Sequence, residues 1–188
     1  KISIYDDSVY IADAAVYLKA TKPELGIADP YALTRDQFNA ALELLRGQRK
    51  IVARYWHDAY VQIDDFKNEG VVASSSWPFQ VNQLRGGGAP ISSVIPVEGA
   101  TGWADSTMLH VDAEHPNCAY LWMDHIVSPQ ANADVAEFFG EAPANEKSCD
   151  LTANKDHCDV FHATNEDYWT NVYYWNTPRK ECLDGRTD

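Results

Sequence analysis

Residues 2–18, with the sequence ISIYDDSVYIADAAVYL, encode a short strand that leads directly into a helix. Residues 2–5 have the composition of a strand, and apolar side chains from Ile11 to Leu18 recur at helical spacing. Asp7 or Ser8 is expected to cap this helix, because a side-chain oxygen there accepts from a backbone N–H of the first turn. The chain therefore opens with a strand-helix unit.

The same alternation continues along the chain. Thr34 to Gln37 has the form of a capping box before an amphipathic stretch that Gly47 can close. Further strands are predicted at residues 51–56, 71–73, 91–95 and 108–111, and further helices after Asp58, Pro78, Pro116 and Pro129, with one more over the aromatic run 168–175. Short strands that alternate with helices predict an α/β fold with a mainly parallel sheet flanked by helices.

Composition excludes several classes of protein. The chain has 188 residues, 45% of them apolar, and 28 acidic against 15 basic residues give a net charge of −13. The apolar and aromatic content excludes a disordered chain. The negative charge argues against binding to nucleic acid or to an anionic membrane surface, and it is compatible with a cationic ligand. No run of about 18 apolar residues is present, so no membrane span is predicted.

The cysteines and the first residue bear on the compartment. Four cysteines allow three pairings, and we favour Cys149 with Cys158 because both lie in a polar, loop-like stretch. The even count favours an oxidising compartment, and free buried thiols in a cytosolic protein are the alternative. The chain starts at Lys1 without a methionine and enters a strand at once, so we expect a processed or excised piece of a longer protein.

Candidate binding residues follow the predicted strands. In an open α/β sheet, ligands bind beyond the carboxyl ends of the strands. Asp7 follows the first strand, and it either caps the helix or faces a cleft and pairs with a cation. Trp77 follows Ser75 and Ser76, and it is either a core plug or an exposed aromatic platform.

Trp103 and Asp105 form the more specific pattern. Residues two apart in an extended segment project to the same side, so an indole face and a carboxylate are expected to converge. This pair suits an ammonium group, which gains cation–π attraction and charge-assisted hydrogen bonds. The alternative is an internal tryptophan beside an aspartate that caps a loop.

Motifs for other chemistry are weak. The glycines at 86–88 lack the lysine and hydroxyl residue of a phosphate-binding loop, and no G-x-S-x-G elbow occurs. His157 and His162 near Cys149 and Cys158 do not fit the spacing of a standard zinc site. No cofactor, metal or catalytic residue is predicted, and the chain is not expected to be an enzyme.

The order strand-Asp-Asp-helix, Ser-Ser-Trp, Pro90 to Glu98 and then Gly-Trp-Ala-Asp-Ser resembles the spermidine/putrescine-binding proteins of bacterial ABC importers. The resemblance extends from Ile2 to about Pro143 and is looser beyond Asn145. It implies a periplasmic-binding-protein-like fold, in which two α/β lobes joined by hinge strands close on a polyamine. Carboxylates hold the amino groups in that family, and aromatic rings sandwich the methylene chain.

The resemblance also implies a set of site residues. The expected ligand-binding residues are Asp7, Tyr10, Trp77, Trp103, Asp105, Glu141 and Thr170. Asp105 resembles the main amine anchor. Tyr10 stands where spermidine binders have a second acid, and Glu141 falls where the family often has a tyrosine, so the exact polyamine stays open.

Segments and location follow from the same resemblance. Residues 1–104 resemble the second lobe, residues 105–150 a first-lobe segment after the hinge, and residues 151–188 a return segment with an aromatic helix and a cysteine-containing tail. The chain is shorter than a full receptor and is expected to lack most of the first lobe. The implied location is periplasmic or otherwise extracytoplasmic, with a lipid anchor left open, and the implied partner is the ABC transporter's membrane permease.

The sequence leaves three alternative functions open. The same fold could bind another small solute, such as a ferric ion, a sugar or an amino acid. Paired carboxylates with tryptophan could instead act on a glycoside, which requires two carboxyls that face one bond. A structural domain with all its tryptophans buried is the third reading.

Overall fold

The structure, a computed structural model, describes residues 1–176 of the chain. These residues form two compact units, unit 1 from residues 1–104 together with the segment that begins at Asn171, and unit 2 from residues 105–170. Cys182 and the rest of the predicted cysteine-containing tail lie outside the described residues.

Unit 1 contains the β-strands. They are β1 (Ile2–Tyr5), β2 (Arg54–Trp56), β3 (Ala73–Ser74), β4 (Ala100–Gly102) and β5 (Val172–Tyr174). One sheet has the order β2-β1-β3 and the other pairs β4 with β5, and every pairing is parallel. The α/β class with parallel sheets flanked by helices, predicted from the sequence, is confirmed.

Helices belong to both units. Unit 1 has α1 (Ile11–Thr21), α2 (Arg35–Gln48), α3 (Ala59–Asn68) and α4 (Pro78–Gly86), and unit 2 has α5 (Pro116–Ile126), α6 (Pro129–Phe139), α7 (His157–Val160) and α8 (Glu166–Trp169). Short 3-10 turns occur at Ser8–Tyr10, Pro23–Leu25 and Glu146–Asp150. None of the helices in residues 1–176 is long and apolar enough to cross a membrane.

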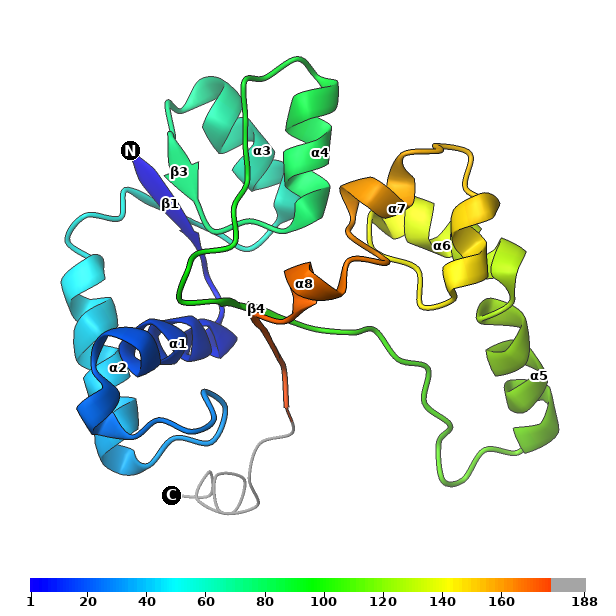
Figure 1. The fold of residues 1–188 in the computed structure, drawn as a ribbon, viewed down its shortest axis with the longest axis horizontal. Coiled ribbons are helices and arrows are strands. Elements are labelled where there is room, and N and C mark those ends of the chain that lie inside the picture. The colour runs from blue at the N-terminus through cyan, green and yellow to red at the C-terminus, as the bar shows by residue number, and fades with distance from the viewer. Residues whose placement is uncertain (177–188) are drawn as a thin grey trace. The chain divides into compact units, whose positions relative to one another are not determined.

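The larger sheet is built around β1, its central strand. The chain passes from β1 through α1 and α2 to β2, and then returns through α3 to β3 on the other side of β1. Figure 1 shows α1 with α2, and α3 with α4, as two separate helical pairs. Because all three strands run the same way, their carboxyl ends lie at one edge of the sheet.

The packing of α1 on α2 forms the main apolar core of unit 1. Ala14, Ala15 and Leu18 of α1 are buried against Ala41 of α2 and against Ile27 from the connecting loop. Small alanine side chains let the two helix backbones approach closely.

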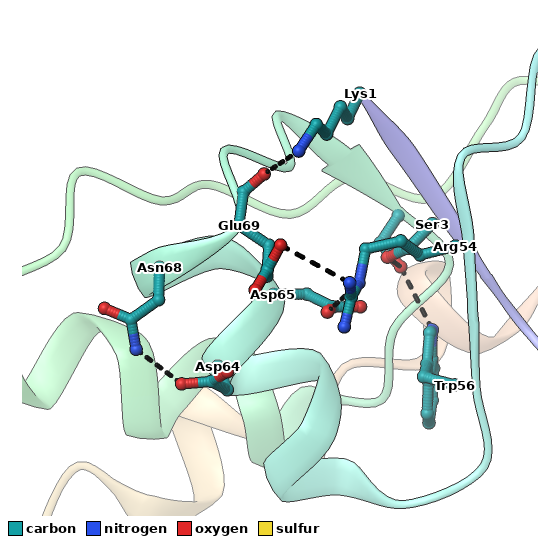
Figure 2. Close-up of polar contacts among 9 residues, drawn as sticks. Lys1, Ser3, Arg54, Trp56, Asp64, Asp65, Asn68 and Glu69 are labelled. Carbon is teal, nitrogen blue, oxygen red and sulfur yellow. Dashed lines mark hydrogen bonds and ion pairs between the residues drawn. The ribbon is translucent and has the colours of Figure 1, made fainter.

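A partly buried ion pair joins β2 to α3. Arg54 Nε donates to Asp65 Oδ1, and Arg54 Nη1 lies 3.4 Å from Glu69 Oε2 (Figure 2). The Asp65 side chain is 0% exposed, and Lys1 Nζ donates to the backbone oxygen of Glu69 at 2.9 Å. These contacts hold α3 against the sheet.

The helices are the regular secondary structure of unit 2, residues 105–170, and the loops between them are held by side chains. Glu137 of α6 accepts from the backbone N–H groups of Ala153 and Asn154 at 2.9 and 2.8 Å. Asn145 Nδ2 donates to the backbone oxygen of Val127 at 2.8 Å. These bonds fold the loop after α6 back onto that helix.

A disulfide closes the same loop. Cys149 and Cys158 are bonded, with 5.7 Å between their Cα atoms, so the favoured pairing is confirmed. Cys118, in the first turn of α5, is exposed and has no disulfide partner among residues 1–176.

Three local predictions are wrong. Residues 91–95 and 108–111 are not strands, and Val94 is 84% exposed in an extended segment without a paired neighbour among residues 1–176. The aromatic run 168–175 is not one helix, because α8 ends at Trp169 and residues 172–174 form β5. Pairing with β4 supplies hydrogen bonds that a helix there would have to replace.

The Arg54–Asp65 contact predicts a measurable stability difference. Substituting Arg54→Ala leaves a fully buried carboxylate without its partner, so we expect a loss of about 2 kcal/mol or more in the free energy of unfolding. Arg46→Ala is the matched control, because the Arg46–Glu43 pair is 69% exposed at both side chains and should lose less than about 0.5 kcal/mol. Urea denaturation measures both values, and equal losses would contradict the account.

Candidate functional site

Aromatic side chains gather at the carboxyl edge of the larger sheet. Tyr5 and Trp56 are cross-strand partners at the ends of β1 and β2, and their ring centroids are 4.7 Å apart. Trp56 is 0% exposed, and its Nε1 donates to Ser74 Oγ of β3 at 3.1 Å. Parallel pairing therefore brings the aromatic residues at the ends of β1 and β2 into contact at this edge.

Trp77 extends this group of rings. It is the N-cap residue of α4, and Pro78 follows it at the first helical position. Its ring contacts Tyr5 and Trp56 edge-on, with centroid separations of 5.2 Å in both cases. The Trp77 side chain is half-buried, so it is neither a sealed core plug nor a fully open platform.

Trp103 and Trp175 continue the same chain of rings. Trp103 lies 5.4 Å from Trp77 and 5.0 Å from Trp175, centroid to centroid, and its ring is stacked on that of Trp175. Trp103 is 39% exposed and Trp175 41%. We refer to the connected rings as the aromatic cluster, which comprises Tyr5, Tyr10, Trp56, Trp77, Trp103 and Trp175.

Asp7 and Tyr10 lie just before α1, and Tyr10 is a member of the aromatic cluster. Asp7 Oδ1 accepts from the backbone N–H of Val9 at 2.9 Å, so Asp7 caps the 3-10 turn Ser8–Tyr10 that precedes α1, whereas α1 itself has no side-chain cap, and the Asp7 side chain is exposed. The Tyr10 ring meets that of Tyr5 edge-on at 5.1 Å. Burial, and then the negative charge of Asp13, raise the pKa of Tyr10, so the phenol is neutral at physiological pH.

Asp13 is an acidic residue near Tyr10 that was not predicted from the sequence. It lies one helical turn after Tyr10, and Thr101 Oγ1 of β4 donates to its Oδ1. Burial raises the pKa of Asp13, and the hydrogen bond from Thr101 opposes that shift. In the sequence, the i, i+3 spacing of Tyr10 and Asp13 indicates that the two side chains lie on the same side of a helix. Asp13 ties α1 to the strand that leads into Trp103.

Asp105 and Glu141 form a carboxyl pair in unit 2. Glu141 follows Gly140, which ends α6 in the left-handed conformation. Burial raises the pKa of Glu141 to about 7, and the negative charge of Asp105 and a hydrogen bond between the two side chains act in the same direction. His157 Nε2 donates to the backbone oxygen of Glu141 at 2.8 Å.

Thr170 is used locally. It follows α8, and its Oγ1 donates to the backbone oxygen of Glu166 at 3.1 Å. This bond completes the helix end, and Thr170 forms no hydrogen bond with Asp105 or Glu141 among the described residues. Its predicted ligand contact stays a prediction.

The predicted residues thus fall into groups within each unit. Unit 1 brings Tyr10, Trp77 and Trp103 into one aromatic cluster. Unit 2 brings Asp105 to Glu141. Trp175 is the ring that sequence reasoning missed, because its neighbourhood depends on the pairing of β4 with β5. No group of three or more His, Cys, Asp or Glu side chains suited to a metal ion occurs within residues 1–176.

Comparison with known proteins assigns the family. Residues 2–172 match the family described as bacterial extracellular solute-binding protein, and the chain belongs to this family. The family binds solutes and is not a family of enzymes, which agrees with the prediction from the sequence. Its description as extracellular favours an extracytoplasmic location.

A curated relative adds detail. The chain is 29% identical over 126 residues to the putrescine/agmatine-binding protein of Pseudomonas aeruginosa, an alignment that covers 64% of this chain and 34% of that protein. The chain thus spans about a third of the length of this curated relative. The predicted resemblance to polyamine-binding receptors is confirmed at the level of the family.

The carboxyl pair predicts an unusual titration. Carbon-detected NMR should show the Glu141 carboxyl titrating with a midpoint of about 7. In Asp105→Asn the midpoint should fall and yet stay above the ordinary value of 4.5, because burial is the largest cause of the shift. Glu137 serves as the internal control, since two backbone hydrogen bonds lower its pKa. A Glu141 midpoint near 4.5 in the unsubstituted chain would contradict this description.

Proposed function

We propose that the chain belongs to the solute-binding component of an ABC importer and that its ligand is a polyamine of the putrescine or spermidine type. The single observation that carries the proposal is the partly exposed aromatic cluster at the carboxyl ends of parallel strands. The name of the Pseudomonas aeruginosa relative, a putrescine/agmatine-binding protein, supports the same ligand class.

The aromatic cluster suits the two parts of a polyamine. An ammonium over an indole face gains about 0.5–2 kcal/mol, depending on how far it is desolvated. Each methylene removed from water against an apolar ring gains about 0.8 kcal/mol. The rings of the predicted residues Trp77 and Trp103 remain partly exposed for such contacts.

Carboxyl groups supply the charge that a polyamine requires. Each ammonium removed from water needs an acidic or hydrogen-bonding partner. None of the ion pairs found among residues 1–176 includes Asp7, Asp105 or Glu141. These acids therefore form no ion pair within the described part of the chain, and a cationic ligand would supply the missing positive charge.

Location and partner follow from the same proposal. A receptor of this kind works outside the cytoplasm, in the periplasm or at the outer face of the membrane, and delivers its ligand to a membrane permease. The disulfide between Cys149 and Cys158 supports an oxidising compartment.

Calorimetric titration of the full chain with putrescine and spermidine tests the proposal. Trp103→Ala should lower the affinity for putrescine about tenfold, because it removes a cation–π partner. Trp122→Ala is the matched control, since Trp122 is 55% exposed on α5, outside the aromatic cluster, and its loss should leave the affinity unchanged. The absence of binding heat for both amines at millimolar concentration would overturn the proposal.

A further inference from the structure

One contact in the aromatic cluster differs in geometry from the rest. The rings of Trp103 and Trp175 are stacked, with 28° between their planes, whereas every other ring pair in the cluster is tilted or edge-on at 43° or more. Two nearly parallel indoles present facing surfaces, and facing surfaces are the geometry that can accept a flat group between them.

Strand register creates this stack. Gly102 of β4 is paired with Tyr174 of β5, so the next residues along the two parallel strands are Trp103 and Trp175. The backbone N–H of Trp175 donates to the oxygen of Gly102 at 2.8 Å, which continues the ladder to the ring-bearing residue. Adjacent parallel strands lie about 4.8 Å apart, a spacing that the 5.0 Å ring separation follows.

Glycine permits the close approach of these strands. A Cβ added at Gly102 would lie 2.8 Å from Val172 Cγ1 of β5. A Cβ at Gly99 would lie 2.8 Å from the backbone oxygen of Asn171, and the φ of Gly99 is +105°. The backbone positions from which the two tryptophans project are therefore held tightly, and only the side chains can separate the rings.

Trp175 is the ring with fewer restraints. Trp77, the other neighbour of Trp103, contacts three rings of the cluster. Trp175 takes part in a single ring contact among those found in residues 1–176, and it is 41% exposed. Rotation of the Trp175 side chain can open the face of Trp103 without disturbing the ends of β1 and β2.

The thickness of the inserted group decides what fits. Carbon atoms in contact lie about 3.5–4.0 Å apart, so a group between two rings needs a plane separation of roughly 7 Å when it is flat and closer to 8 Å when it is a methylene chain. A guanidinium is planar, cationic, weakly hydrated and known to stack on aromatic faces, whereas an ammonium is compact and strongly hydrated. The tight strand spacing favours the flat cation.

We infer that Trp103 and Trp175 form an indole clamp for the guanidinium end of a guanidino-amine, with Trp175 as the residue that sets this specificity. The inference rests on the proposed function and refines its ligand class. Agmatine and putrescine are matched probes, because they share the same four-carbon chain and a terminal ammonium and differ only in the guanidinium at the other end.

Calorimetric competition between the two amines in the full chain tests the clamp. The unsubstituted chain should bind agmatine about tenfold more tightly than putrescine, which corresponds to about 1.4 kcal/mol. Trp175→Leu, which keeps apolar bulk and removes the ring face, should reduce that preference to about threefold or less. Trp175→Phe should give an intermediate preference, and the control Trp122→Ala should keep the full preference.

Circular dichroism gives an independent reading. Neighbouring indoles couple their electronic transitions, so Trp175→Leu and agmatine should each change the tryptophan signal of the unliganded chain, while the coupling of Trp77 with Trp56 persists. An unchanged agmatine preference across both Trp175 variants, or no preference in the unsubstituted chain, would overturn the clamp and leave the proposed function standing. Failure of both amines to bind the unsubstituted chain would overturn the two together.

Discussion

Parallel strand pairing is the constraint on which the rest of the structure depends. When strands run the same way, the residues that follow them meet at one edge, whatever their distance in sequence. This rule brings Tyr5, Trp56 and Trp77 together after β1, β2 and β3, and it sets Trp103 beside Trp175 after β4 and β5. The aromatic cluster is therefore a consequence of sheet topology, and helix packing behind the sheet keeps the strand ends in place.

The rings of the aromatic cluster contact one another in the structure, and these contacts affect the free energy of ligand binding. Each aromatic pair contributes about 0.5–1.5 kcal/mol beyond its buried area, so a ligand that separates two rings must replace that attraction with its own contacts. A cation with apolar or planar surface can do so, because it meets the ring quadrupole as well as the ring surface. The carboxyl pair of unit 2 has the opposite character. There, burial and like charge favour a shared proton, and a cation would favour release of that proton.

Local signals in the sequence predicted local structure well. The capping box at Thr34 forms as expected, and Gly140 ends its helix in the left-handed conformation. Pairing between distant segments was harder to predict. Residues 91–95 have strand composition yet find no partner among the described residues, whereas the aromatic run near the end of the chain forms β5 because β4 is its neighbour. Trp175 escaped prediction for that reason, since its position depends on contacts some 70 residues away in sequence.

A crystal structure of the full chain soaked with agmatine tests the central claim most directly, because it locates the cation relative to the rings. The account predicts electron density for the ligand against the face of Trp103, with the contact between Trp103 and Trp175 opened to admit it. Saturating ligand that leaves the whole aromatic cluster in its unliganded arrangement, with density elsewhere on the molecule, would contradict the account.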